Sequence, residues 1–369
     1  MKIPSTIPFP RLKFFRRLAL HGTLVAFTCL PVTAAIVTWN GAAGDGSTAT
    51  NGNWAGGVAA TSGDSIEIAS DPSAAPRFFG FDQAIVFAAP TFTFLATAPA
   101  MLVTAASADD ILNVTATGTA VSNLSSVRQT TANLTIRIGP TTQIWDGGAN
   151  GLSISAIDLQ NNHTLTLTGT GTNATTRNEI TVGIDGTGTS GVVKSGAGTL
   201  LYSGANTYIG TTSVTAGILQ LGAGERIANT SNLLLSNGAM LRMANFTETV
   251  GTLSIGAGGG IIDFGVGAGN NSLILLDSSA SSWAAGLTIL NFNTGDSLKI
   301  GSSNGALTLS QLSNIIFQSG TATNGSGSQV GAISATGVVT PTTVPEPTSA
   351  MLIGLGLMAI AARRRQRCG

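Results

Sequence analysis

The sequence predicts an all-β fold, a parallel, right-handed β-helix or solenoid, and three observations lead to this class. Charged residues make up only 9 % of the 369 residues, 43 % are hydrophobic and 48 are glycine, which favours short buried strands joined by tight turns. Strand-like segments recur at a nearly constant interval. Within them apolar side chains alternate with other side chains, so one face of each strand points into a core. A β-sandwich, which also uses many short strands, is the competing class.

The first 35 residues have the three parts of a signal peptide. A basic segment comes first, an apolar run covers about residues 18–30, and small residues follow, so cleavage is expected after Ala34 or Ala35. The alternatives are an uncleaved anchor helix and a lipoprotein attached through Cys29, although the residues before this cysteine fit a lipoprotein motif poorly. We therefore expect transient binding to the Sec export machinery.

Residues 36–160 are less regular, and we expect an N-terminal β region that caps the fold. Trp39 and Trp54 bracket a stretch rich in Gly, Thr and Ala, and the segment around Trp145 is similar to it. Because the exposed strands at the end of a repeat stack need a cover, these indoles are expected to pack over the open end. The alternative is that Trp39 and Trp54 are platforms on which sugar rings stack.

Residues 161–319 contain a loose internal repeat and are predicted to form the solenoid. One series of strand-like units has starts that are 18, 22 and 21 residues apart, at Thr199, Gly217, Ala239 and Gly260. A second series interleaves with it and starts at Thr212, Asn232, Thr252 and Ser272. Two strands in roughly 20 residues, repeated several times, are typical of a solenoid whose turns stack on one another.

Three sequence blocks in residues 192–222 resemble the autotransporter-associated β-strand repeat. They are K-x-G-x-G-T-L from Lys194, S-G-A-N-T-Y-x-G-T-T from Ser203 and V-x-A-G-x-L-Q-L-G from Val214. One good copy is present, and the later turns are degenerate. The resemblance implies a passenger-type β-helix.

The end of this region is predicted to close the solenoid. Residues 287–292 and 296–300 have the pattern of strands, and residues 311–317 that of a short helical turn followed by a strand. Residues 320–343 are rich in Gly, Ser and Thr, which predicts a flexible spacer with a possible last strand near residues 332–339.

The last 26 residues have the order of a sorting tail. They begin with Val344, Pro345, Glu346 and Pro347. A short hydrophobic helix is expected over residues 350–362, and its 13 residues span roughly 20 Å, less than the roughly 30 Å of a hydrocarbon core. The chain then closes with the basic residues Arg363, Arg364, Arg365 and Arg367, which should stay on the cytoplasmic side.

This tail resembles the PEP-CTERM sorting signal of Gram-negative bacteria. The resemblance implies recognition by an exosortase, a membrane transpeptidase-like enzyme that would cut near Pro345–Pro347. It also implies transient anchoring in the inner membrane and delivery to the cell surface or an extracellular matrix. A plain short tail anchor is the alternative.

The charge distribution argues against a nucleic-acid partner. Nine of the 17 basic residues lie in the two terminal clusters, which leaves eight basic residues against 17 acidic ones elsewhere in the chain. Phosphate binding needs a basic face. The two cysteines, Cys29 and Cys368, lie in the leader and the tail, so the body has neither a disulfide framework nor a thiol nucleophile.

Few residues offer catalytic chemistry, and we expect no enzyme, cofactor or metal site. His163 is the sole histidine between the two terminal signals, and its surroundings indicate a turn residue. Asp109 and Asp110 are the one adjacent acidic pair and are expected to cap a strand entry, while Asp263 is expected to be solvated. The predicted function is therefore a surface or matrix protein with a structural or adhesive role. A β-helix that binds or degrades carbohydrate, with extracellular polysaccharide as its partner, is the alternative.

Overall fold

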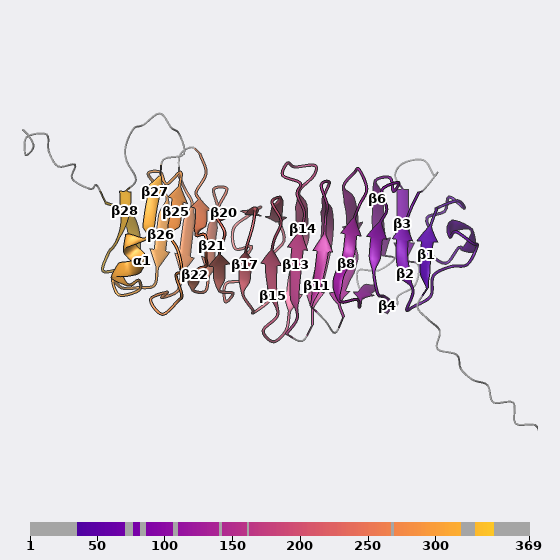
Figure 1. The fold of residues 1–369 in the computed structure, drawn as a ribbon, viewed down its shortest axis with the longest axis horizontal. Helices are drawn as coiled ribbons and strands as arrows, with labels where there is room; N and C mark the ends of the chain where they lie inside the picture. The colour runs from indigo at the N-terminus through magenta and orange to yellow at the C-terminus, as the bar shows by residue number, and fades with distance from the viewer. Residues whose placement is uncertain are drawn as a thin grey trace, which may run out of the picture. The chain divides into compact units, whose positions relative to one another are not determined.

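The computed structural model describes residues 35–70, 77–81, 86–105, 110–139, 142–160, 162–266, 269–318 and 329–342 (Figure 1). In this part of the chain nearly all the regular elements are short strands. The sorting motif, the hydrophobic run and the arginine cluster lie outside the described residues, as does the predicted signal peptide up to Ala34.

Ten strands stack along one axis and form the first face of a solenoid. They pair in the order β1 (Ile36–Trp39), β2 (Ser65–Ile68), β5 (Phe92–Phe94), β8 (Gly118–Asn123), β11 (Gln143–Asp146), β13 (Thr164–Thr168), β15 (Gly191–Lys194), β17 (Thr212–Val214), β19 (Leu233–Leu235) and β22 (Leu253–Ile255).

A second face runs beside the first for the length of the stack. Its strands are β3 (Arg77–Phe81), β6 (Met101–Ala105), β9 (Gln129–Ala132), β12 (Leu152–Leu159), β14 (Asn178–Gly186), β16 (Thr199–Tyr202), β18 (Ile218–Leu221), β20 (Ala239–Arg242), β23 (Gly260–Asp263), β25 (Leu287–Leu290) and β27 (Ile315–Gln318).

The third face has strands near both ends of the stack but is interrupted in the middle. It contains β4 (Val86–Ala89), β7 (Ile111–Val114), β10 (Thr135–Ile138) and, further on, β21 (Thr247–Val250), β24 (Ser272–Leu275) and β26 (Ser297–Ile300). The long strands β12 and β14 extend onto it with their C-terminal halves. Between β14 and β21 this face has no strand among the described residues, and side chains together with single backbone hydrogen bonds connect the turns there.

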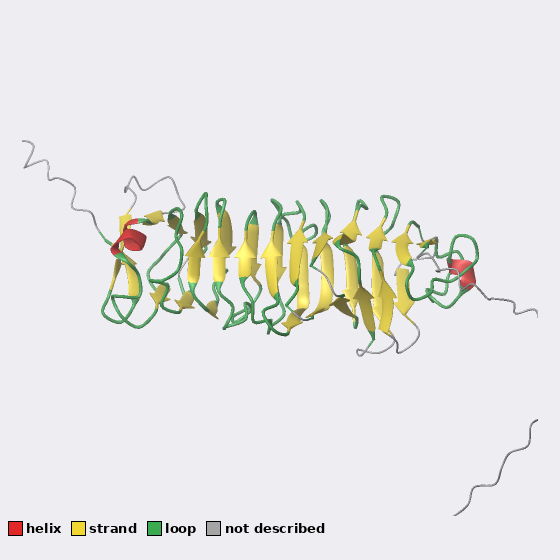
Figure 2. Ribbon diagram, turned by 60° about the horizontal axis from the view of Figure 1, so that its bottom comes forward, coloured by secondary structure: helices red, strands yellow, loops and turns green. Residues whose placement is uncertain are grey.

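Each strand of the three faces pairs with its equivalent in the next turn, and this pairing is parallel. The fold is a parallel β-solenoid of about ten turns, as predicted (Figure 2). A β-sandwich is excluded, since its sheets are antiparallel.

The turns near residue 200 have the predicted length. Val192 pairs with Thr212, and Thr212 pairs with Leu233, so the chain returns after 20 and 21 residues. Towards the N-terminus the turns are longer, because Ile36 pairs with Ser65 and Phe92 with Val121. The described strands of residues 36–160 therefore belong to the same solenoid. The sequence had predicted a separate, irregular β region for this segment. The loops between these strands vary in length, and this hides the period.

The interior is filled by apolar side chains that stack on their equivalents in neighbouring turns. On the second face one such column is completely buried and consists of Leu200, Leu219, Leu241, Ile262 and Ile289. Removing the side chain of one of these leucines would cost about 2–5 kcal/mol. The members of this column are the inward-facing residues of the alternating apolar pattern that predicted the fold.

The N-terminal end is covered by a loop that contains the 3-10 helix η1 (Asn51–Asn53). The backbone of Ala55 donates to Thr38 at 2.8 Å, so the loop occupies the outer edge of β1. Trp39 and Trp54 are 0 % and 2 % exposed and meet edge to face with ring centroids 5.3 Å apart. The predicted packing over the open end is confirmed for these two residues. Their proposed role as sugar platforms is wrong, because neither indole presents a free face.

The C-terminal end is closed by antiparallel pairing. Strands β28 (Gln329–Ile333) and β29 (Val338–Pro341) pair with each other and with β27 and β26. The helix α1 (Leu309–Ser313) begins at Thr308 with a capping box and is followed by β27, as predicted. Composition predicts a flexible spacer over 320–343, but residues 329–342 are a hairpin. The hairpin is held by backbone hydrogen bonds at the edge of the sheet, and few of its side chains are buried. Its sequence therefore shows only weakly the apolar alternation that predicts a strand.

Candidate functional site

Lys194 lies at the end of β15 with its side chain inside the solenoid, where it is 2 % exposed. Its ammonium donates to the carbonyl oxygens of Ser195, Gly196 and Ala216 at 2.6, 2.7 and 3.1 Å. Ala216 belongs to the following turn, so Lys194 connects two turns at one corner. Burial lowers the pKa of Lys194 to about 8. The lysine of the K-x-G-x-G-T-L block is thus a structural residue.

Replacing Lys194 with methionine is expected to destabilise this corner by about 1–3 kcal/mol, because buried carbonyl groups lose their donor. Hydrogen exchange of the amides in residues 191–222 measures the change. Lys299→Met is the matched control, since Lys299 is half-exposed on the outer face of β26. Equal effects of the two substitutions would show that Lys194 has no such role.

The glycines of the repeat lie where one turn crosses the next. A Cβ atom on Gly204 would come within 2.0 Å of the backbone of Val182, and one on Gly210 within 2.3 Å of the carbonyl oxygen of Thr189. Real Cβ atoms do not approach other atoms so closely. These positions therefore require glycine because successive turns touch there through their backbones.

Asn206 bridges three turns in the interrupted part of the third face. Its Oδ1 accepts from the amide of Ile184 at 2.7 Å, and its Nδ2 donates to the carbonyl of Arg226. Nearby, the buried hydroxyl of Tyr208 is hydrogen-bonded to Thr212 at 2.6 Å. Asn206 of the S-G-A-N-T-Y block thus connects successive turns where strand pairing is missing.

Glu248 makes a similar connection between turns, one turn further along the stack. It points inward from β21, is 0 % exposed, and accepts hydrogen bonds from the amides of Arg226 and Ile227 at 2.8 and 2.7 Å. Burial raises the pKa of Glu248 to about 7, although the two amide hydrogen bonds act to lower it. Sequence reasoning missed this residue. The alternation of Thr247-Glu248-Thr249-Val250, which puts Glu248 on the same face as Val250, could have pointed to it.

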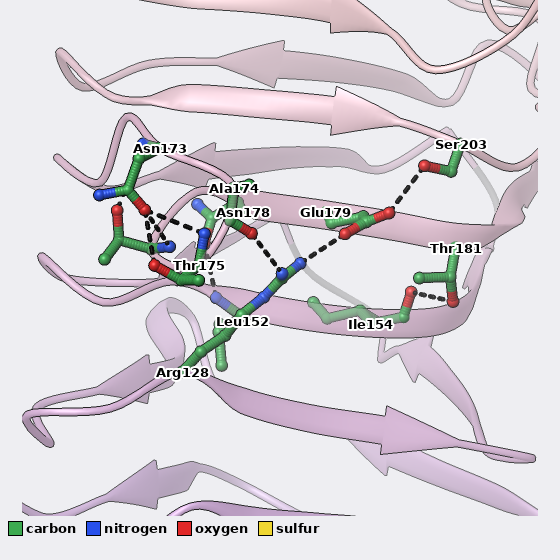
Figure 3. A network of polar contacts seen from close by, with 11 residues as sticks. Arg128, Leu152, Ile154, Asn173, Ala174, Thr175, Asn178, Glu179, Thr181 and Ser203 are labelled. Atoms are coloured by element: carbon green, nitrogen blue, oxygen red, sulfur yellow. Dashed lines mark hydrogen bonds and ion pairs between the residues drawn. The ribbon is translucent and has the colours of Figure 1, made fainter.

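The outer flank of the second face carries a polar network, drawn in Figure 3. Arg128 forms an ion pair with Glu179 at 2.7 Å, and the hydroxyl of Ser203 donates to the other carboxylate oxygen at 2.8 Å. Partial burial acts to raise the pKa of Glu179, but these hydrogen bonds and the charges of Arg128 and Arg177 hold the pKa below its ordinary value. Glu179 is therefore a stably ionised structural carboxylate and is poorly suited to donate a proton.

Asp263 also takes part in an ion pair. It is 7 % exposed, lies 3.1 Å from the guanidinium of Arg242 in the previous turn, and accepts a hydrogen bond from Asn291 at 2.7 Å. The prediction that Asp263 is solvated was wrong, because the register of the stack brings Arg242 beside it.

The other candidate residues are not brought together into a site. His163 is half-buried in the turn before β13, as predicted. Asp110 is buried and precedes β7, while Asp109 lies outside the described residues. Among the described residues no three His, Cys, Asp or Glu side chains are grouped so that they could hold a metal ion.

In the sequence, the predicted signal peptide precedes the first strand of the solenoid, and the sorting motif follows its last described strand. Ala35 is the first described residue and is exposed; its amide donates to Asp64 at 3.0 Å. At the other end, Thr342 donates from its amide to the carbonyl of Val330 at 2.9 Å. The hairpin is therefore ordered to within two residues of Val344. Neither helix in the described residues has the length and hydropathy that a bilayer crossing requires.

Residues 343–365 match the family described as the PEP-CTERM protein-sorting motif. The chain carries a PEP-CTERM sorting motif. Residues 192–221 match the passenger-associated-transport repeat, which is an autotransporter-type repeat. No curated protein and no solved structure matches the chain.

Both matches confirm the resemblances seen in the sequence. The PEP-CTERM motif implies recognition by an exosortase, and together with the repeat it indicates an exported, cell-surface-associated protein. The structure explains the repeat physically, because Lys194, Asn206 and the glycines are the residues that join successive turns.

Proposed function

We propose that this PEP-CTERM protein is an exported, non-enzymatic β-solenoid that an exosortase detaches from the inner membrane by cutting near Pro345–Pro347. The position of the sorting motif relative to the fold is the observation that supports this most directly. The last described strand ends at Pro341, and the matched sorting motif begins at residue 343. The tail can therefore be removed without taking any strand of the solenoid with it.

In this proposal the tail holds the precursor until it is cut. The signal peptide starts export through the Sec machinery, and the arginine cluster keeps the end of the tail on the cytoplasmic side. The nine residues from Thr342 to Ala350, joined by eight Cα–Cα steps, span at most about 28 Å when extended. The C-terminal end of the solenoid is therefore held close to the membrane before cleavage, and the freed body then reaches the cell surface or an extracellular matrix.

The body itself has a structural or adhesive role in this proposal. Its outer faces present short polar side chains at regular spacing, for example Thr164, Thr166 and Thr168, which alternate with the buried leucines of β13. The carboxylate with the most strongly raised pKa, Glu248, is enclosed where no substrate reaches it. Extracellular polysaccharide is the partner that such a surface fits.

Replacing Pro345, Glu346 and Pro347 together with alanine is expected to leave the precursor in the membrane fraction and to abolish most of its release. Fractionation followed by intact-mass measurement of the released protein provides the test. Thr348→Ala with Ser349→Ala is the control, because these residues directly follow the Pro-Glu-Pro segment without being part of it. Release of the triple variant at the wild-type level would contradict processing by an exosortase.

A carbohydrate-binding or polysaccharide-degrading role is the second candidate, and a hollow beside the N-terminal cap favours it. The hollow has a volume of about 330 Å³, and its walls include Phe81, Phe87, Thr48 and Ser62. Aromatic rings beside hydroxyl groups can hold a sugar. Binding on a glycan array that is lost in Phe87→Ala would support a binding module, and release of shortened product would support an enzyme.

A further inference from the structure

Asp64 fixes the start of the described chain. Its carboxylate lies just before β2 and is 8 % exposed. One oxygen accepts from the amide and the hydroxyl of Thr61 at 2.9 and 2.8 Å, and the other accepts from the amide of Ala35 at 3.0 Å. The carbonyl of Ala35 in turn accepts from the amide of Ser65 at 2.8 Å. The backbone nitrogen of Ala35 is therefore held against a buried carboxylate.

Within the part of the chain that the structure describes, this carboxylate has no ion-pair partner. Burial acts to raise the pKa of Asp64, but the hydrogen bonds from Thr61 and Ala35 hold the pKa below its ordinary value. Asp64 is thus an ionised, largely buried group. A positive charge at the nitrogen of Ala35 would give this carboxylate an ion-pair partner.

We propose that the signal peptide is cut between Ala34 and Ala35, and that Asp64 binds the α-ammonium group which this cut creates. Water adds across the peptide bond, so that Ala34 leaves with a new carboxylate and Ala35 keeps the nitrogen as an ammonium group. The inference rests on the proposed export. It decides between the two cleavage positions that the sequence allows, because a cut after Ala35 would remove the nitrogen that Asp64 binds.

The proposal gives the N-terminal cap a charge pair that exists only after processing. The uncut chain has a neutral amide at Ala35, and the mature chain has an ammonium at the same place with the same hydrogen bond. The small residues Val32 and Ala34 stand at the positions before the cut that export peptidases read. The end of the solenoid is therefore stabilised when the leader is removed.

N-terminal sequencing and intact mass of the exported protein test the cleavage position. A chain that starts at Ala35 is expected. A chain that starts at Ile36, or at any other residue after the leader, would overturn this proposal and leave export intact. A surface protein that retains residues 1–34 would overturn both.

A double-mutant cycle on the mature protein tests the role of Asp64. Asp64→Asn keeps an acceptor for Ala35 but removes the charge, and it should lower the Tm by about 2–4 °C. With the α-amino group acetylated, the same substitution should have at most half this effect. Asp277→Asn is the control, since this exposed carboxylate binds Ser279 far from the N-terminus.

The pH dependence has a defined sign. The carboxylate should raise the pKa of the α-amino group above its usual value of about 8. The stabilisation should then be complete below that value for as long as Asp64 is ionised, and it should be lost as the pH rises through the raised pKa. An effect of Asp64→Asn that is the same for the free and the acetylated protein would overturn the proposed ion pair.

Discussion

Replacing Gly217 with alanine is expected to destabilise the repeat by about 2–5 kcal/mol. Gly217 has φ +66°, and a Cβ there would lie 2.3 Å from the carbonyl oxygen of Gly198 in the previous turn. Left-handed backbone costs a non-glycine residue about 1–2 kcal/mol, and the overlap forces two turns apart at a further cost of about 1–3 kcal/mol. Because the repeat joins its neighbours on both sides, the middle of the solenoid should open first.

Gly238→Ala separates the two contributions. Gly238 lies at the corresponding corner one turn later and has φ +71°, but a Cβ there would meet nothing within 4 Å. It should therefore cost only about 1–2 kcal/mol, the part that comes from the backbone conformation. Chemical unfolding and hydrogen exchange at residues 192–242 measure both variants. Equal losses would contradict the argument that the repeat glycines are required by contact between turns.

Replacing Glu248 with alanine is expected to lower the local stability of residues 226–248 by about 2–5 kcal/mol, because two buried amides lose their acceptor. The amides are those of Arg226 and Ile227. Their hydrogen exchange reports the free energy of opening this segment directly. Glu225→Ala is the matched control, since its side chain is exposed in the same loop and its carboxylate accepts from Thr249.

The wild-type segment should also become less stable as the pH rises. The pKa of Glu248 is raised from 4.5 to about 7 in the folded protein, so the folded state binds this proton more tightly than the unfolded state does. Stability is then highest below about pH 4.5, falls by roughly 3 kcal/mol on the way to pH 7, and levels off above it. Glu248→Gln should remove this dependence. Exchange protection of Ile227 that is constant from pH 5 to 7 in the wild type would contradict it.

The sorting motif near the C-terminus was predicted from the sequence and is confirmed by the family match, whereas Asp64 and Glu248 in the body were missed. Pro345 and its neighbours are recognised by order along the chain, so no fold is needed to see them. Asp64 and Glu248 carry no local signal of this kind. Asp64 accepts from the amide of Ala35, 29 residues away in the sequence, and Glu248 accepts from the amide of Ile227, 21 residues away. Only the stacking of turns brings these groups together.

The sequence by itself determined the fold class, the length of the regular turns and the C-terminal sorting motif. These features depend on short contiguous segments of the sequence. Examples are the alternation of inward-facing and outward-facing residues in Ile218–Leu221 and the order of motif, apolar run and arginine cluster in the tail. The tertiary structure decided that the solenoid already begins at Ile36, that residues 329–342 close it as a hairpin, and that Asp263 is paired with Arg242. Those outcomes depend on the register between turns. In a parallel solenoid the partner of a residue lies one whole turn away, and the length of each turn is set by loops whose composition does not reveal it.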